Sequence, residues 1–176
     1  MLRRYEKFLN EFDKKLEQYF SEQSEHICCK IGCCECCEIG DYPFTELEMH
    51  YLFEGFKSLD IQKQAHVRNS IARIKKNRVS VHLYYKCPFL INNECCVYKY
   101  RGLTCRVYGL AYITNGNIVK IPECVHKNLC YGKVFKDNYL CAEPIKEDLS
   151  LLSIIARNAA RYKLKFGTSR SLIDWF

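Results

Sequence analysis

Apolar residues recur at three- and four-residue spacing in four stretches of the chain, which predicts helices there. The first is expected over residues 2–21, on a stripe of Leu2, Tyr5, Leu9, Phe12, Leu16 and Tyr19. A second follows Pro43, because Thr45 and Glu48 have the spacing of a capping box. A third begins at Asp60 as cap and runs to about Lys76, with its stripe defined by Ile61, Ala65, Arg68, Ile71 and Ile74. The last begins at Pro144, a favourable first helical residue, and continues to about Lys165.

Between the third and the last helix the pattern becomes short and alternating. Val79, Val81, Leu83 and Tyr85 alternate with more polar neighbours, as in a strand. Asn92-Asn93 separates residues 89–91 from 95–98, and Asn115-Gly116-Asn117 separates 105–113 from 118–121, so two β-hairpins are predicted. The expected fold class is α+β and predominantly α, with terminal helices around a small β-hairpin and an irregular, cysteine-rich region.

The chain has 176 residues, which fit one compact domain over 1–176. A chain of this length can bury about 70% of its unfolded surface, so a missing core does not explain its thirteen cysteines. The N-terminal residues lack the apolar core of a secretory signal, and no apolar run approaches the roughly 20 residues that span a membrane. We therefore expect a cytoplasmic, reducing setting, where clustered cysteines indicate metal or redox chemistry rather than disulfides.

The densest cysteine cluster lies between residues 28 and 37. Four of its members, spaced by three, two and no residues, are candidate metal ligands: Cys29, Cys33, Cys36 and Cys37. Thiolates at such spacing can turn toward one centre, as in zinc sites and iron–sulfur clusters, and Gly32 suits a tightly folded loop. Cys28 and Cys34 are extra, and because adjacent side chains usually point apart, their role stays open.

A second, dispersed group begins at Cys87 and runs to Cys141. Cys95 and Cys96 lie on a predicted strand, where successive side chains point to opposite faces, so only one of them should face a metal. Cys87 and Cys95 could reach one centre across the hairpin. Cys130 and Cys141 are read first as small buried apolar residues.

The sequence resembles the CxxCxxCC family of cysteine-cluster proteins that chelate zinc or iron. The resemblance rests on Cys29, Cys33, Cys36 and Cys37, and on Cys87-Pro88-Phe89-Leu90 followed by Cys95, Tyr98, Arg101, Cys105-Arg106 and Cys124. It covers residues 29–124 and departs from the family at Gly102, where proline is usual, and in the first cysteine spacing. It implies eight metal ligands: Cys29, Cys33, Cys36, Cys37, Cys87, Cys95, Cys105 and Cys124.

Flagellin lysine N-methylase carries a similar cysteine domain, and this resemblance implies an iron–sulfur cluster, of the four-iron type, in preference to zinc. Soft thiolates suit both. Three functions are carried forward: a cysteine-ligated metal-binding protein, an enzyme that modifies a protein or peptide substrate through the cluster, and a zinc-stabilised nucleic-acid binding module. The formal charge of +7 does not by itself predict nucleic acid as a partner, because each four-thiolate zinc site removes about two charges.

Two arginines and two histidines lie near the cysteines in the sequence and are further candidates for the site. Arg101 and Arg106 either offset thiolate charge, hold an acidic substrate group, or serve the fold through internal bonds. His26 and His126 lie close to cysteines in the sequence and could complete a site.

Overall fold

The computed structural model describes residues 1–30, 32–77 and 85–176. Its contacts divide the chain into two compact units, which we name unit 1 (residues 1–30 and 106–165) and unit 2 (residues 31–105 and 166–176). The predicted fold class is confirmed, because the described chain is predominantly helical and its strands form small two-stranded antiparallel sheets. The strand expected from Val79 to Tyr85 lies, apart from Tyr85, outside the described residues.

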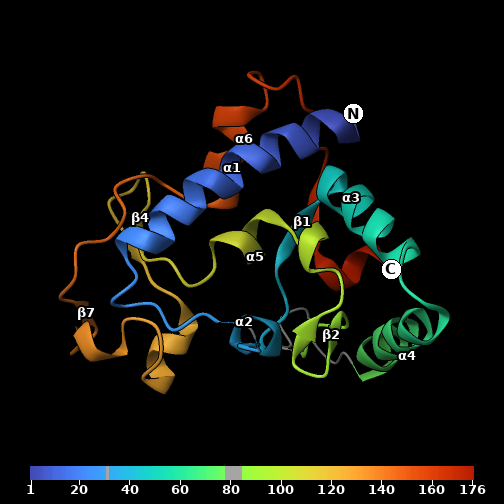
Figure 1. Ribbon diagram of the computed structural model, residues 1–176, viewed down its shortest axis with the longest axis horizontal. Helices are drawn as coiled ribbons and strands as arrows, with labels where there is room; N and C mark the ends of the chain where they lie inside the picture. The colour runs from blue at the N-terminus through green and yellow to red at the C-terminus, as the bar shows by residue number, and fades with distance from the viewer. Residues whose placement is uncertain (31, 78–84) are drawn as a thin grey trace. The chain divides into compact units, whose positions relative to one another are not determined.

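Six α-helices and eight strands are described (Figure 1). The helices are α1 Leu2–Glu22, α2 Glu35–Glu38, α3 Glu46–Lys57, α4 Ile61–Asn77, α5 Leu103–Val107 and α6 Leu151–Asn158. The strands are β1 Pro43–Thr45, β2 Leu90–Ile91, β3 Glu94–Cys95, β4 Tyr112–Ile113, β5 Val119–Lys120, β6 Phe135–Lys136, β7 Tyr139–Leu140 and β8 Ser169–Ser171. Short 3-10 helices cover Tyr98–Tyr100, Glu123–Lys127, Gly132–Val134 and Leu172–Trp175.

The first helix, α1, belongs to unit 1 and matches its prediction. Its buried face is Tyr5, Phe8, Leu9, Phe12 and Leu16. The helix lies beside α6 and the turn that follows it (Figure 1), where the rings of Phe8 and Tyr162 are 5.3 Å apart. Tyr19 at the other end of α1 donates a hydrogen bond to Glu147 at 2.6 Å. The amphipathic stripe therefore serves the packing of unit 1.

The last helix starts later than predicted. Pro144 does not begin it, because Ile145 is held in an extended bridge to Tyr112 through hydrogen bonds with Ala111 and Ile113. Helix α6 begins at Leu151 instead, and the Asp148 carboxylate accepts the backbone N–H of Ser150 just before it. Within α6 the buried residues are Ser153 and Ile154, whereas Leu152 is 76% exposed.

Two hairpins of unit 1 show how turn residues set the strands. The Asn115-Gly116-Asn117 hairpin forms, but its strands β4 and β5 have two residues each, and the segment predicted as strand from 105 onward contains helix α5. The β6–β7 hairpin was not predicted. Asp137 and Asn138 both have positive φ there, which is the geometry of a tight two-residue hairpin turn.

Unit 2 packs α3 and α4 around an apolar core. The capping box at the start of α3 is confirmed, since Thr45 and Glu48 exchange hydrogen bonds. In α4 the predicted stripe is right for Ile71, which is buried, and for Ile74, which packs against the core, but Ile61 is 72% exposed and Val67, outside the stripe, is fully buried. The core also contains Leu172 and Ile173 near the C-terminus. They are held there by the antiparallel pairing of β1 with β8, two strands distant in sequence.

The Asn92-Asn93 hairpin of unit 2 forms as predicted. Leu90 pairs with Cys95, and Ile91 pairs with Glu94. Both asparagines have positive φ, 51° and 62°, as this turn requires. The second strand is shorter than expected, because the chain after Cys95 enters a turn and then the 3-10 helix Tyr98–Tyr100. The hairpin thus presents Cys95 on a short, well-defined strand.

Candidate metal centre

The eight predicted ligands fall into both units. All thirteen cysteines lie in the described residues, and none forms a disulfide bond. Six predicted ligands belong to unit 2 and two, Cys29 and Cys124, to unit 1. We name two groups by their contacts. The unit 2 thiol cluster is Cys36, Cys37, Cys87, Cys95 and Cys105; the unit 1 thiol cluster is Cys28, Cys29, Cys124 and Cys130.

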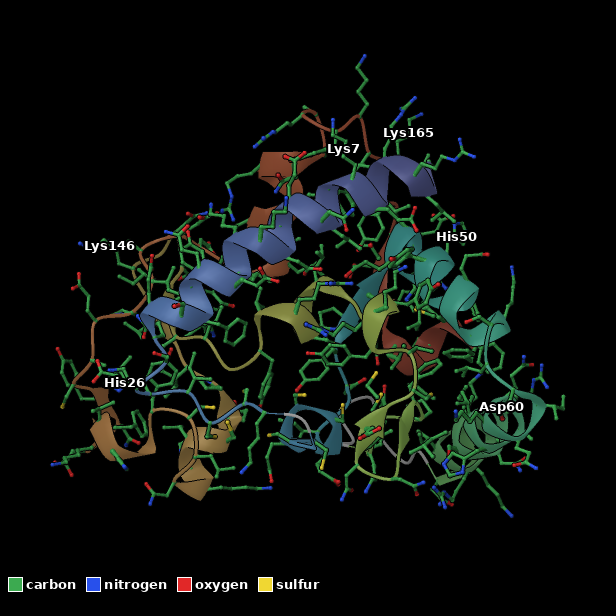
Figure 2. The ribbon with its side chains drawn as sticks, viewed as in Figure 1. Lys7, His26, His50, Asp60, Lys146 and Lys165 are labelled. Atoms are coloured by element: carbon green, nitrogen blue, oxygen red, sulfur yellow. The ribbon has the colours of Figure 1, made fainter. Side chains whose placement is uncertain are left out.

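The unit 2 thiol cluster joins four separate segments of chain. The sulfurs of Cys36 and Cys37, both in α2, are 3.9 Å apart. Cys37 shares a hydrogen bond with the Cys87 thiol. Cys105 interacts electrostatically with Cys36, Cys37 and Cys95. Figure 2 shows sulfur atoms, drawn in yellow, beside α2 and β2.

Main-chain contacts bring α2 against the segment that carries Cys87. The Cys87 N–H donates to the Cys37 carbonyl at 2.7 Å, and the Gly40 N–H donates to the Tyr85 carbonyl at 2.7 Å. A Cβ on Gly40 would lie 2.9 Å from both the Cα and the nitrogen of Cys87. A glycine is therefore required where the two backbones meet.

The remaining two thiols of this cluster are fixed by the hairpin and by α5. Cys95 lies in β3 opposite Leu90. Cys105 lies in α5, whose first residue, Leu103, donates its N–H to the buried Glu48 carboxylate at 2.7 Å. The same carboxylate accepts the N–H of Thr45 at 2.8 Å. Glu48 thus connects the start of α3 to the helix that carries Cys105.

The surroundings of these thiols favour the neutral form in the absence of a cation. Burial raises the pKa of Cys95 to about 11 and raises that of Cys105 well above its ordinary value. The contact with Cys37, together with burial, raises the pKa of Cys36. Arg101 opposes these shifts at Cys36 and Cys95. A bound metal would supply the positive charge that stabilises thiolates here.

Cys33 and Cys34 lie at the edge of this cluster. Cys34 precedes α2, and its sulfur is 3.9 Å from Glu38. Burial raises the pKa of Cys34, and the negative charge of Glu38 raises it further. Cys33 interacts with its neighbour Cys34.

The unit 1 thiol cluster is centred on Cys130. The Cys130 sulfur lies 3.2 Å from that of Cys28 and 3.6 Å from that of Cys29. It also shares a hydrogen bond with Cys124 and accepts the N–H of Cys28 at 3.3 Å. The hydrogen bond between Cys124 and Cys130 is the main reason that the pKa of Cys130 is lowered. The same bond raises the pKa of Cys124.

Turns of the backbone assemble this second cluster. Tyr131 has a positive φ of 60°, and its N–H donates to the His26 carbonyl at 2.7 Å. The Leu129 N–H returns to the Cys124 carbonyl at 3.2 Å. Gly109, at φ 98°, lies so close that a Cβ there would be 2.7 Å from the Cys29 sulfur. Segments far apart in sequence therefore meet at Cys130.

Both clusters have the chemistry of a soft-metal donor set. Four sulfurs around a zinc ion at about 2.3 Å lie roughly 3.8 Å apart. The sulfur–sulfur separations of 3.9, 3.6 and 3.2 Å in the two clusters are near that value. Among residues 1–30, 32–77 and 85–176, however, no group of three or more His, Cys, Asp or Glu side chains is already arranged to hold an ion. Binding would require the thiol side chains to rearrange.

The arginine and histidine candidates make other contacts. Arg106 is 4% exposed and bonds the Asp13 carboxylate at 2.7 Å, an internal ion pair of unit 1. The Arg101 guanidinium lies 3.7 Å from the centre of the Tyr98 ring. The described contacts of His26 are with Glu25 and the Tyr131 ring, and the ring of His126 contacts that of Phe135. These contacts favour the structural interpretation of Arg106.

Comparisons with family models, with curated proteins and with solved structures found no match. The resemblance to the CxxCxxCC family therefore stays a prediction. Within the described ranges, no helix is both long enough and apolar enough to cross a membrane.

Sequence reasoning did not place Cys28 and Cys130 together. The useful signal was local: Asn128 lies between Cys124 and Cys130, and it adopts φ 56°. Asparagine is one of the few residues that adopt this conformation readily, so it indicates a turn that could fold the chain back between two cysteines.

Proposed function

We propose that this chain is a cysteine-ligated metal-binding protein whose metal centre is held by the unit 2 thiol cluster. One observation carries the proposal: Cys87, Cys95 and Cys105 pack against the apolar core of unit 2, and each interacts with one or both of the adjacent thiols of Cys36 and Cys37, whose sulfurs are 3.9 Å apart. A packed core alone does not require cysteine at these positions. Thiolates that converge in this way are the ligands that zinc and iron–sulfur clusters use.

Metal identity follows from the donors and from the resemblance. All donors are sulfur, and soft thiolates suit zinc and iron–sulfur clusters alike. The resemblance implies an iron–sulfur cluster, so this form is tested first, with zinc as the alternative. Four of the five thiols would ligate. If the adjacent thiols of Cys36 and Cys37 can both turn toward the metal, the expected ligands are Cys36, Cys37, Cys87 and Cys105. If they cannot, Cys95 takes the place of Cys36.

The direct experiment is purification of the full chain without oxygen, followed by iron, inorganic sulfide and zinc analysis per chain. Visible absorption with iron and sulfide identifies a cluster, and a colourless chain with zinc identifies a zinc site; both support the proposal. Cys105→Ser and the double variant Cys36→Ser/Cys37→Ser should each lose the unit 2 metal. Cys96→Ser is the matched control, because Cys96 neighbours Cys95 on the chain, whereas the charged groups that act on its own thiol are those of Lys63 and Asp60.

Two results would overturn the proposal. One is a freshly isolated, oxygen-protected chain that folds without metal. The other is full metal content in both Cys105→Ser and the double variant. The protein- or peptide-modifying enzyme and the nucleic-acid module stay predictions.

A further inference from the structure

We propose that the unit 1 thiol cluster is a second, separate metal site, in which Cys28, Cys29, Cys124 and Cys130 bind one zinc ion. This inference does not depend on the metal centre of unit 2, because the four cysteines belong to another compact unit. It also adds two residues, Cys28 and Cys130, that lie outside the eight ligands predicted from the sequence.

The first support is the position of Cys130 among the other three sulfurs. Cys28 and Cys29 are adjacent in sequence, and adjacent side chains usually point apart. Here both of their sulfurs approach Cys130, at 3.2 and 3.6 Å. Cys124 completes the group through its hydrogen bond to Cys130. Three sulfurs, those of Cys28, Cys29 and Cys124, thus approach the sulfur of Cys130.

The second support is the size of the group. Sulfurs of a tetrahedral zinc site lie roughly 3.8 Å apart, so the ion would need the closest pair to separate by only about half an ångström. A four-iron cluster attaches each of its ligands to a different iron, and the thiols would have to move much farther. The separations of the Cys130 sulfur from those of Cys28 and Cys29 therefore favour a single ion over a four-iron cluster.

The third support is the surrounding protein. Cys130 is fully buried and Cys124 is 5% exposed, whereas Cys29 is exposed, which leaves the ion a route in. The Cys28 N–H donates to the Cys130 sulfur at 3.3 Å, and such outer hydrogen bonds orient metal ligands. Binding forms four zinc–sulfur bonds, while the protons of the thiols pass to solvent.

The test measures zinc in the full chain purified without oxygen. The wild type should contain one equivalent of zinc that Cys130→Ser lacks. Cys29→Ser should lose the same equivalent, and because Cys29 is exposed, this variant leaves the buried packing intact. Cys141→Ser is the matched control: Cys141 is an exposed cysteine of the same unit, and the zinc content should equal that of the wild type.

Cobalt provides a second measurement. Cobalt bound in place of this zinc should give the visible absorption of a tetrahedral thiolate site in Cys105→Ser, whose unit 2 site is disabled, but not in the double variant Cys29→Ser/Cys105→Ser. That pattern separates the two sites. If Cys105→Ser loses its metal while Cys29→Ser and Cys130→Ser match the wild type, the second site is refuted and the proposed function stands. If all variants match a metal-free wild type, both proposals fail.

A disulfide is the competing fate of these thiols. A bond between Cys28 and Cys130 would need their sulfurs to close to about 2.0 Å. Mass spectrometry of the oxygen-protected chain that finds this bond in place of zinc would also overturn the second site.

Discussion

The two thiol clusters are built by different means. In unit 2, the cysteines lie in or beside regular elements, and a buried carboxylate, Glu48, holds the helix that carries Cys105. In unit 1, the cysteines lie in turns and a short 3-10 helix, and a buried hydroxyl, that of Tyr131, takes the anchoring role. It accepts the Ala111 N–H at 2.9 Å and donates to Gln23 at 3.1 Å. The cluster of unit 2 is therefore supported by a charged group, Glu48, between helices, which we call the charged anchor. The cluster of unit 1 is supported by a neutral hydroxyl, that of Tyr131, between loops, which we call the neutral anchor.

The largest effect is expected at the charged anchor. Glu48→Ala removes a carboxylate that accepts bonds from Thr45 and Leu103, and it leaves buried N–H groups without an acceptor. We expect a loss of about 4 kcal/mol in unfolding free energy, together with loss of the unit 2 metal. Denaturant unfolding and metal analysis check both. Glu54→Ala is the control, because Glu54 is in the same helix but exposed; equal losses in the two variants would contradict the anchoring role.

The next effect is expected where two backbones meet. Gly40→Ala would place a Cβ 2.9 Å from backbone atoms of Cys87, and neither partner can turn away, so we expect a cost of about 3 kcal/mol and weaker unit 2 metal binding. Gly109→Ala meets the Cys29 side chain instead. It should reduce zinc in unit 1 and leave the metal of unit 2. Gly116→Ala is the control, since its nearest neighbour would be 3.9 Å away. Equal metal retention in Gly40→Ala and Gly116→Ala would refute the argument.

A smaller effect, dependent on pH, is expected at Asp148 in unit 1. Burial acts to raise the pKa of this carboxyl, but hydrogen bonds from Ser150, Ser153 and Asn115 outweigh it and hold the pKa well below the usual range. Asp148→Asn should lower the unfolding free energy by about 2 kcal/mol at pH 7. Because the pKa of Asp148 is lower in the folded chain than in the unfolded chain, the ionised carboxylate stabilises the fold at pH values above the unfolded pKa of about 3.9. This stabilisation is lost as the pH falls toward the folded pKa.

The difference in unfolding free energy between the wild type and Asp148→Asn should therefore shrink below about pH 4, by roughly 1.4 kcal/mol per pH unit. Unfolding curves at pH 7, 4 and 3 measure the difference. A gap that does not change with pH would show that the charge of Asp148 is not what stabilises the start of α6.

The neutral anchor of unit 1 should matter less than the charged one of unit 2. Tyr131→Phe keeps the buried ring and removes only the hydroxyl, so the cost should be about 1 kcal/mol. Zinc should remain in unit 1 with reduced affinity. A Tyr131→Phe variant as unstable as Glu48→Ala would break the comparison. Tyr139→Phe is the control, because Tyr139 is 71% exposed.

The sequence predicted what depends on local chemistry. The capping box of Thr45 and Glu48 and the Asn92-Asn93 turn were found because neighbouring residues make the contacts themselves. The stripe of α1 was correct because one long helix repeats its pattern many times. The eight ligands were selected through a resemblance, and the structure brings five of them together in unit 2.

Long-range contacts could not be predicted in this way. Pro144 was a plausible start for the last helix, but Ile145 forms a β-bridge with Tyr112 instead. The residues near Pro144 in the sequence give no sign of this distant partner. Cys130 looked like a small core residue because its three thiol partners lie 6 to 102 positions away. The pairing of β1 with β8 joins Phe44 to Arg170 for the same reason.

The smallest effect compares one hairpin from each unit. Asn93 in unit 2 and Asn138 in unit 1 have φ of 62° and 61°, and each is the second residue of its turn. Glycine adopts this conformation without strain, and we expect this gain to exceed the cost of the extra entropy that glycine gives the unfolded chain. Asn93→Gly and Asn138→Gly should therefore each stabilise the fold by about 0.5 kcal/mol. Asn10→Gly, in the exposed part of α1, should destabilise slightly instead. Because the two turns share one geometry, the two gains should be equal in thermal unfolding. A gain confined to Asn93→Gly would show that the regular hairpin of unit 2 contributes more to folding than the loop-built region of unit 1.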